Sequence, residues 1–209
     1  QVSLGNECNF QCTYCNPKFS SKWEQDVRTK PYKVFTDRFF YSIDPKQSDV
    51  MDKNIEFLST ISHIEKLGVQ GGEPLLNKKF FKLLDVVNSD ELHLATNLSC
   101  NRTVLDDLIK RANNYKLITV HISIDATGKI AEFTRFGLNF ESFTQNLDYL
   151  IANKPANMNI IIGSLMTSIT VKDIKNLSEY IKSRDVYWGL TYCQYPEIQS
   201  FSTLQDKYK

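Results

Sequence analysis

Three closely spaced cysteines constrain this chain more than any other feature of its sequence. Cys8, Cys12 and Cys15 fall within eight residues, and no fourth cysteine lies near them. Iron–sulfur clusters of the four-iron type are normally held by four thiolates. Three thiolates on a single loop can therefore leave one iron free to bind another ligand. An open coordination position separates a reactive metal centre from a structural one, as it does for zinc. The motif predicts a reactive iron–sulfur centre.

Structural zinc sites are an alternative, because they also use cysteines two or three residues apart and a distant Cys or His. The residues that could complete such a site are Cys100, Cys193, His63, His93 and His121, and none has the paired spacing of a zinc finger or ribbon. A non-catalytic, zinc-stabilised interaction module stays open as a hypothesis. A disulfide framework is disfavoured, because five cysteines is an odd number in a chain of 209 residues.

The composition is typical of an intracellular enzyme of about one domain. Apolar residues make up 42% of the chain and charged residues 23%, with a formal net charge of +1. Such a chain can bury a sizeable core and has no global field that attracts nucleic acid or an anionic membrane. No apolar stretch is long enough to span a bilayer, and residues 1–5 lack the pattern of a signal peptide. We expect a cytoplasmic protein without DNA or membrane partners. The first residue, Gln1, suggests a trimmed chain.

Strand-like and helix-like segments alternate along the chain. Apolar and β-branched runs predict six strands, at Val2–Gly5, Ile64–Gln70, Leu92–Thr96, Leu117–Asp125, Met158–Leu165 and Val186–Tyr192. Apolar residues at three- and four-residue spacing predict amphipathic helices within 80–87, 104–112, 143–151 and 174–181. Thr103 with Asp106, and Thr170 with Asp173, resemble capping boxes that would start two of these helices.

This alternation favours parallel βαβ units with right-handed crossovers. Six units do not complete an eight-fold barrel, which usually takes about 250 residues. We therefore expect an α/β fold, a partial (β/α)6 barrel that is open and TIM-like, over residues 1–196. Residues 197–209 would be a C-terminal extension or the start of a missing domain. Residues 16–50 would form an elaborated first connection, whose aromatic residues pack over the barrel mouth or stack on a nucleobase: Trp23, Tyr32, Phe35, Phe39, Phe40 and Tyr41.

Polar or glycine-rich peptides occur at the end of one predicted strand after another. In a parallel barrel, reactive groups gather on the rim formed by the C-terminal ends of the strands. From the first strand to the sixth, the peptides are the cysteine loop, Gln70-Gly71-Gly72-Glu73-Pro74, Thr96-Asn97-Leu98, Ser123 with Asp125, Gly163 with Ser164, and Cys193-Gln194-Tyr195-Pro196.

At this point the motifs resemble the radical S-adenosylmethionine (radical SAM) superfamily. The spacing Cys-x3-Cys-x2-Cys, with the aromatic Tyr14 before the last cysteine, is similar to the signature of that family, and Gly-Gly-Glu-Pro at 71–74 is similar to its second landmark. The run Ser-Ile-Asp-Ala at 123–126 and Arg135 before Gly137 resemble the branch whose barrel is followed by a SPASM or twitch domain. That domain typically holds an auxiliary cluster through further cysteines. No cysteine follows Cys193, so we expect the twitch domain to be absent from this chain.

The resemblance implies a reaction. Cys8, Cys12 and Cys15 would hold three irons of a [4Fe-4S] cluster, and S-adenosyl-L-methionine would bind the fourth. A reductant such as flavodoxin or ferredoxin would supply the electron that cleaves S-adenosylmethionine to a 5′-deoxyadenosyl radical, which takes hydrogen from a substrate peptide or small polar molecule. This chemistry belongs to the cofactor, which the protein orients. An activating enzyme that installs a glycyl radical on a partner protein is a second hypothesis.

The resemblance also implies which rim residues bind the cofactor. Arg135 would pair with the methionine carboxylate, and Ser123 and Asp125, two apart on a strand, would both face the ribose or the methionine end. Gly71 and Gly72 would let the backbone approach the ligand, and Glu73 would fix the turn or hold the cofactor ammonium. The full set is Tyr14, Gly71, Gly72, Glu73, Pro74, Thr96, Asn97, Ser123, Asp125, Arg135, Gly163 and Ser164.

Three further residues have separate expectations. Cys193, past the sixth strand, is a candidate catalytic residue that donates a hydrogen atom to a product radical, or else a thiol of the pocket wall. Cys100 is expected to be a small buried apolar residue. His121 shares a strand side with Ser123 and Asp125, which makes it the histidine to test.

Overall fold

A six-stranded sheet forms the centre of the structure, a computed structural model that describes residues 1–30, 47–200 and 204. Every pairing within this sheet is parallel. The α/β class and the partial, open barrel of parallel strands are thereby confirmed. In spatial order the strands are β1 (Val2–Ser3), β3 (Ile64–Gln70), β4 (Ser89–Thr96), β5 (Leu117–Ser123), β7 (Met158–Met166) and β8 (Tyr187–Tyr192).

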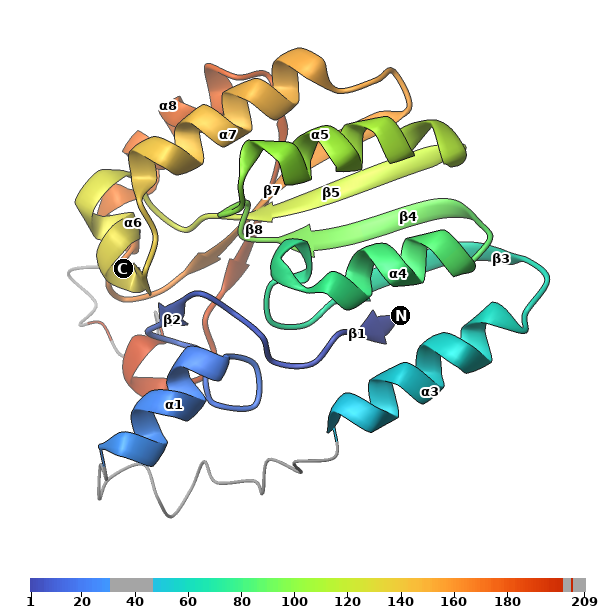
Figure 1. The fold of residues 1–209 in the computed structure, drawn as a ribbon. Helices are drawn as coiled ribbons and strands as arrows, with labels where there is room; N and C mark the ends of the chain where they lie inside the picture. The colour runs from blue at the N-terminus through green and yellow to red at the C-terminus, as the bar shows by residue number, and fades with distance from the viewer. Residues whose placement is uncertain (31–46, 201–203, 205–209) are drawn as a thin grey trace.

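Four helices cover the outer face of the curved sheet (Figure 1). They are α4 (Lys78–Val86), α5 (Arg102–Arg111), α7 (Phe140–Asn153) and α8 (Ile174–Lys182). All four predicted helices are therefore confirmed. Each carries buried apolar residues at three- or four-residue spacing, and these join the buried side of the strands in one core cluster.

The opposite face of the sheet, which we call the inner face, carries the site. On β5, Ile118, Val120 and Ile122 are fully buried in the core cluster, whereas His121 and Ser123 line cavities on the inner face. Successive side chains of a strand point to opposite faces, so this alternation divides core from site. In Figure 1 the arrowheads of β4 and β5 point toward α6 and the loop that contains β2. The C-terminal ends of the strands and the cysteine loop thus lie together.

The first connection, between β1 and β3, contains two helices that the sequence did not predict. They are α1 (Ser21–Thr29) and α3 (Gln47–Ser59). Ser20 is the N-cap of α1, and its Oγ accepts a hydrogen bond from the backbone N of Trp23. The other aromatic residues predicted to pack over the mouth or stack on a base lie outside the described residues: Tyr32, Phe35, Phe39, Phe40 and Tyr41.

A small antiparallel ribbon was also not predicted. It joins β2 (Gln11–Cys12) to β6 (Arg135–Phe136), which directly follows α6 (Gly128–Thr134). Strands of two residues are too short to leave a periodic sequence signal. Short 3-10 helices lie at Pro74–Leu76, Ala112–Asn114, Val171–Asp173 and Glu197–Gln199. Within the described part of the chain, no helix combines the length and apolar character needed to cross a membrane.

The two predicted capping boxes are wrong. Helix α5 begins at Arg102, which puts Thr103 inside the first turn, and α8 begins at Ile174, one residue after Asp173. Neither helix has a side-chain hydrogen bond at its N-cap.

The physical reason is that both aspartates are engaged by other elements. The carboxylate of Asp106 accepts a hydrogen bond from the hydroxyl of Tyr149 in α7. The carboxylate of Asp173 accepts two from Thr127, one from the backbone N at 2.5 Å and one from Oγ1 at 2.9 Å. Tertiary contacts have taken the place of the local caps.

Candidate active site

The cysteine loop is held on one side by the Gly-Gly-Glu turn that follows β3. The backbone N of Glu73 donates to the carbonyl of Glu7 at 2.7 Å. Gly72 has φ +52°, and a Cβ added there would lie 2.2 Å from that same carbonyl oxygen. Gly71, at φ +100°, would place a Cβ 2.3 Å from the Oγ of Ser3. In the structure both glycines therefore make room for the chain's own N-terminal loop.

The β2–β6 ribbon holds the other side of the loop. Cys12 lies opposite Arg135 in the ribbon, and the backbone N of Thr13 donates to the carbonyl of Thr134 at 2.8 Å. Gly137 has φ +107°, and a Cβ there would lie 2.8 Å from the carbonyl oxygen of Asn9. The loop is thus packed between two separate parts of the barrel.

Helix α1 supplies a third set of contacts to the loop. The indole N–H of Trp23 donates to the carbonyl of Cys12 at 2.9 Å. The backbone N of Cys8 donates to Ser21 Oγ at 3.1 Å, and Ser20 Oγ donates to the carbonyl of Phe10 at 2.6 Å. These contacts were not predicted, because residues 21–29 have no clear periodicity that would indicate a helix beside the cysteine loop.

All three motif cysteines line one cavity of about 440 Å³, which we call the thiol cavity. Burial raises the pKa of Cys8 to about 11 and that of Cys15 to about 12, and it also raises the pKa of Cys12. No disulfide links any of the cysteines. The predicted site residues that share this cavity with them are Tyr14, Gly71, Gly72, Thr96, Asn97, Ser123 and Arg135.

Glu73 lies behind this cavity and makes its contacts within the chain. Its side chain is fully buried, and Oε1 accepts hydrogen bonds from Leu75 N at 3.1 Å and Thr96 Oγ1 at 2.6 Å, while Oε2 accepts one from Asn97 N at 2.5 Å. Burial raises the pKa of the carboxyl to about 7, although the hydrogen bonds oppose that shift. Glu73 thus ties its turn to the end of β4. Pro74 begins the adjoining 3-10 helix and is buried.

Asn97 links the end of β4 to the cysteine loop. Its Nδ2 donates to Asn9 Oδ1 at 3.0 Å, and its Oδ1 accepts from Ser99 N at 2.8 Å. Asn9 in turn donates to the carbonyl of Ser99 at 3.3 Å. Sequence reasoning missed Asn9, and its position inside the cysteine motif was the one available signal.

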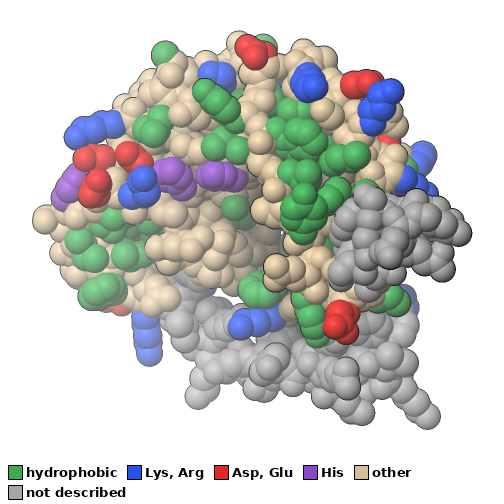
Figure 2. All heavy atoms as spheres, turned by 180° about the vertical axis from the view of Figure 1, so that it is seen from behind, with side chains coloured by type: hydrophobic (Ala, Val, Ile, Leu, Met, Phe, Trp, Pro, Cys, Tyr) green, Lys and Arg blue, Asp and Glu red, His purple; other side chains and the backbone are tan. Residues whose placement is uncertain are grey.

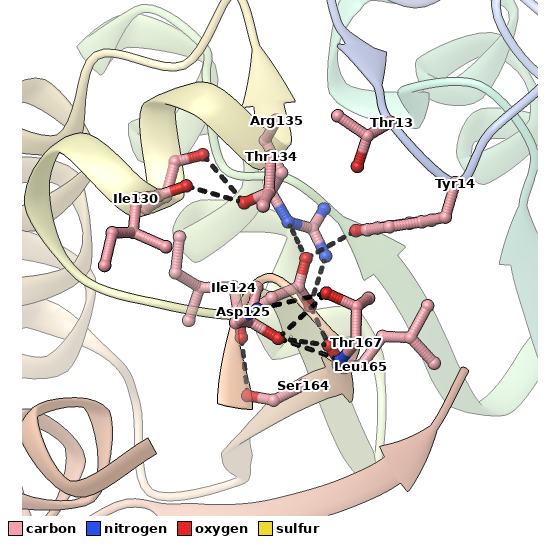
Figure 3. A network of polar contacts seen from close by, with 12 residues as sticks. Thr13, Tyr14, Ile124, Asp125, Ile130, Thr134, Arg135, Ser164, Leu165 and Thr167 are labelled. Carbon is pink, nitrogen blue, oxygen red and sulfur yellow. Dashed lines mark hydrogen bonds and ion pairs between the residues drawn. The ribbon is translucent and has the colours of Figure 1, made fainter. Parts of the chain in front are cut away.

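A buried ion pair connects β5 to the cysteine loop (Figure 3). Arg135 donates from Nε to Asp125 Oδ2 at 2.8 Å and from Nη2 to Oδ1 at 3.0 Å, and the exposed fraction of the Asp125 side chain is 0%. The hydroxyl of Tyr14 donates to Oδ2 at 2.5 Å, and Leu165 N donates to Oδ1 at 2.8 Å. Burial raises the pKa of Tyr14 well above its usual value.

This network changes what the sequence led us to expect of Asp125 and Arg135. Four donors already occupy the Asp125 carboxylate, and two nitrogens of the Arg135 fork are bound to it. The two residues hold each other, and through Tyr14 they hold the cysteine loop. Ser123, two residues before Asp125, lines the thiol cavity and also a second cavity of about 370 Å³, which we call the rim cavity.

The rim cavity lies between β5, β7 and β8. Gly163 lines it beside Gly189, its partner in the parallel pairing. His121 also lines it, two residues before Ser123 on the same side of β5. Ser164 also borders the cavity, but its hydroxyl donates to the carbonyl of Ile124 at 2.5 Å and accepts from Trp188 Nε1 at 3.0 Å.

The remaining cysteines line neither the thiol cavity nor the rim cavity. Cys193 is buried, its Sγ donates to the carbonyl of Tyr195 at 3.3 Å, and it borders neither the thiol cavity nor the rim cavity in the described part of the chain. Cys100 is half-buried against the core cluster, and burial raises its pKa to about 12. Burial and then the nearby Asp125 raise the pKa of Cys193, so this thiol lies near the buried ion pair, and its role as a hydrogen donor stays a prediction.

Comparison with known proteins gives the family. Residues 2–181 match the family model described as the radical SAM superfamily. The chain belongs to the radical SAM superfamily. Members of this superfamily are enzymes that use a [4Fe-4S] cluster and S-adenosylmethionine. This chain is therefore part of an enzyme.

Curated relatives and solved structures agree with this assignment. The chain is 25% identical over 193 residues to the GTP 3′,8-cyclase of Helicobacter pylori strain HPAG1, covering 89% of this chain and 52% of that protein. It is 24% identical over 187 residues to a probable GTP 3′,8-cyclase of Methanocaldococcus jannaschii, covering 87% and 54%. The chain thus spans about half the length of the curated relatives that it matches.

The structural neighbours show the same fold. Streptococcus suis SuiB bound to its precursor peptide SuiA superposes with a TM-score of 0.57 and 14% identity, covering 96% of this chain and 40% of that chain. SuiB bound to S-adenosylmethionine gives a TM-score of 0.55 at 14% identity, covering 94% and 41%.

The residues of this structure fit the cofactors of the family. Three thiols from one loop open into a single cavity that is large enough for a further ligand, and thiolates are the ligands that iron–sulfur clusters use. Within the described residues, no three His, Cys, Asp or Glu side chains converge on one position for a single metal ion.

Proposed function

We propose that this chain is the catalytic barrel of a radical SAM enzyme that acts on a peptide or a small polar molecule. In this proposal Cys8, Cys12 and Cys15 hold three irons of a [4Fe-4S] cluster, and S-adenosylmethionine binds in the thiol cavity. The single observation that carries the proposal is that the three thiols open into the same cavity as Gly71, Gly72, Ser123 and Arg135. When bound, the reduced cluster and S-adenosylmethionine supply a 5′-deoxyadenosyl radical that removes a hydrogen atom from the substrate.

The chain's own residues have distinct roles in this proposal. The thiols of Cys8, Cys12 and Cys15 lose their protons on binding iron, since metal ligation requires the thiolate. Ser123 offers a hydroxyl to the ribose or the methionine end of the cofactor from the shared wall of the two cavities. Asp125 and Arg135 act as positioning residues, because their contacts keep Tyr14 and the loop in place.

The remaining predicted residues complete the cofactor wall. Thr96, Asn97 and Tyr14 line the thiol cavity beside the two glycines, and Gly163 lines the rim cavity where a base would lie. Glu73 and Pro74 hold the turn from behind. An electron from a partner such as flavodoxin or ferredoxin starts the reaction.

Two comparisons support the two substrate classes. The curated relatives are GTP 3′,8-cyclases, which act on a small molecule, and the structural neighbour SuiB has been seen with a precursor peptide. An activating enzyme that installs a glycyl radical on a partner protein is the alternative. Such an enzyme would need a surface large enough to dock that protein.

Anaerobic reconstitution tests the proposal. We expect about four irons per chain, as for a [4Fe-4S] cluster, and dithionite-dependent formation of 5′-deoxyadenosine. Cys12→Ala should lose both iron and product. Cys100→Ala is the matched control, because this thiol borders neither the thiol cavity nor the rim cavity, and it should keep both. Full iron retention in Cys12→Ala would contradict the ligand assignment. Tightly bound zinc with no 5′-deoxyadenosine would favour the interaction module.

A further inference from the structure

The inner face continues beyond the site into a third cavity of about 500 Å³, which we call the inner cavity. It shares Gln70 and Ala95 with the thiol cavity and His121 with the rim cavity. A molecule that reaches from the cofactor along the inner face therefore meets His121. His93 and Lys66 line the inner cavity on the far side.

Two imidazoles face each other across neighbouring strands of this surface. The rings of His93 on β4 and His121 on β5 are stacked, with centroids 6.0 Å apart and planes at 26°. Figure 2 shows histidine side chains next to one another on this face, with acidic and basic side chains between them and a further histidine at the edge of the view.

The two histidines differ in their partners. Nε2 of His93 lies 3.1 Å from Oε2 of Glu91, which also accepts the ammonium of Lys66 at 2.9 Å. For the ring of His121, the described residues provide no hydrogen-bond or ion-pair partner. Burial and the nearby His93 lower the pKa of His121, so at neutral pH its ring is uncharged and still offers one N–H to a ligand.

The carboxylates in and beside the walls of the three cavities are paired with bases. Among the described residues that border them, Asp125 is the one carboxylate, and Arg135 neutralises it. Lys66, His93 and His121 also border the cavities, and Glu91, outside the lining, contacts both Lys66 and His93. The imidazole of His121 and the amide of Gln70 therefore offer N–H donors to the cavities, whereas Nε2 of His93 already faces Glu91.

The rim cavity beside His121 is kept open by glycines that the fold does not require. Gly163 and Gly189 are paired in register and border the rim cavity, and neither has a positive φ. An added Cβ would meet a single atom at 4.0 Å from Gly163 and at 3.9 Å from Gly189. A side chain would fit the chain itself at both positions, so the glycines serve the cavity.

We propose that His93 and His121 form a subsite for the phosphate or carboxylate group of a small-molecule substrate. This inference rests on the proposed function and names the substrate class of that same barrel. The anionic group lies in the inner cavity, and the rest of the substrate extends past Ser123 toward the thiol cavity. His121 donates its N–H to the anion, and the amide of Gln70, at the junction of the two cavities, supplies a second donor. His93 lies stacked against the ring of His121 and forms the wall behind it.

Ring NMR of the reconstituted, histidine-labelled protein tests this directly, because the chain has three histidines. Pyrophosphate and acetate are the two probes, titrated separately. We expect saturable shifts of the His93 and His121 signals with at least one probe. Tighter binding of pyrophosphate would identify the group as a phosphate, and tighter binding of acetate would identify it as a carboxylate. His63, which pairs with Asp90 at 3.4 Å and borders none of the three cavities, is the internal control and should not move.

Matched variants complete the test. His121→Gln should weaken binding of the preferred probe about tenfold, the value of one hydrogen bond to a charged group, and His63→Gln should leave it unchanged. Equal shifts of all three histidines, or no saturable shift at His93 and His121, would overturn the subsite.

The same samples separate this inference from the proposed function. If 5′-deoxyadenosine forms but neither probe binds, the subsite is wrong and the cofactor assignment stands. If the probes bind but iron and product are absent, the cofactor assignment is wrong and the anion site stands.

Discussion

Arg135 holds Asp125 through two hydrogen bonds, of 2.8 Å and 3.0 Å, although Asp125 lies just after β5 and Arg135 begins β6, with the whole of α6 between them. The same carboxylate receives the hydroxyl of Tyr14. One buried charge pair therefore connects the end of a barrel strand to the loop that carries the cysteines. Removing one partner of such a pair leaves the other charge buried and uncompensated, which costs far more than the pair contributes as a whole.

Asp125→Asn should therefore destabilise the fold by about 3–5 kcal/mol. Urea unfolding of the cluster-free protein at neutral pH measures this. Asp148→Asn is the control, because Asp148 pairs with Arg184 at 2.7 Å but its side chain is 51% exposed. An exposed pair contributes less than about 1 kcal/mol. Equal losses in the two variants would mean that burial does not set the value of the Asp125 pair.

Tyr14→Phe should cost less than the loss of the ion pair. The variant removes one donor from the Asp125 carboxylate and leaves Arg135 and Leu165 N in place. A lost hydrogen bond to a buried charged group costs about 1–3 kcal/mol. Tyr149→Phe is the matched control, since its hydroxyl bonds Asp106 at an exposed position and should cost less than about 0.5 kcal/mol. A Tyr14→Phe protein as stable as wild type would exclude this hydroxyl as an anchor of the loop.

Gly72→Ala should destabilise the fold and lower the iron content after reconstitution. Its φ of +52° is unfavourable for alanine, and the new Cβ would lie 2.2 Å from the carbonyl oxygen of Glu7, so the cysteine loop must shift. Gly128→Ala isolates the first effect, because Gly128 has φ +49° with no atom within 4 Å of an added Cβ. The control should lose about 1 kcal/mol and keep its iron. Normal iron binding by Gly72→Ala would show that the turn does not position the loop.

Glu73 should make the cluster-free protein less stable as pH rises. Its folded pKa of about 7 lies above the ordinary value of 4.5, so between these values the folded state holds a proton that the unfolded state has released. This contribution is fully present below about pH 4.5 and is lost as pH rises through 7. It amounts to roughly 3 kcal/mol at most, at 1.36 kcal/mol per unit. Denaturation at several pH values should give a weaker decline for Glu73→Gln; parallel curves would contradict the buried carboxyl.

Much of the barrel could be predicted from sequence, because long periodic segments carry strong signals. All six strands of the sheet and its four outer helices occur where apolar periodicity indicated them, with small shifts at their ends. β4 begins at Ser89 rather than Leu92, and β5 ends at Ser123 rather than Asp125. Strand ends are set by pairing with neighbours, which no single segment encodes.

The site was predicted less completely, because its contacts join residues that are far apart in the chain. The sequence motifs predicted that Asp125 and Arg135 both lie at the cofactor-binding rim, but they could not indicate that the two side chains bind each other. The caps expected at Thr103 and Thr170 failed for the same reason, since Asp106 and Asp173 contact other elements. Helices α1 and α3 lie in a connection with no clear periodicity.

The β2–β6 ribbon has a consequence for engineering. Transplanting the cysteine motif into another barrel would carry over the ligands without the strand that flanks them. A working graft would also need residues 134–137 and the turn at Gly71 and Gly72, placed so that both contact the loop. The smallest transferable unit is therefore discontinuous in sequence. Directed recombination between homologues should therefore tolerate crossovers within α7 or α8 and reject those that separate the motif from its distant strand.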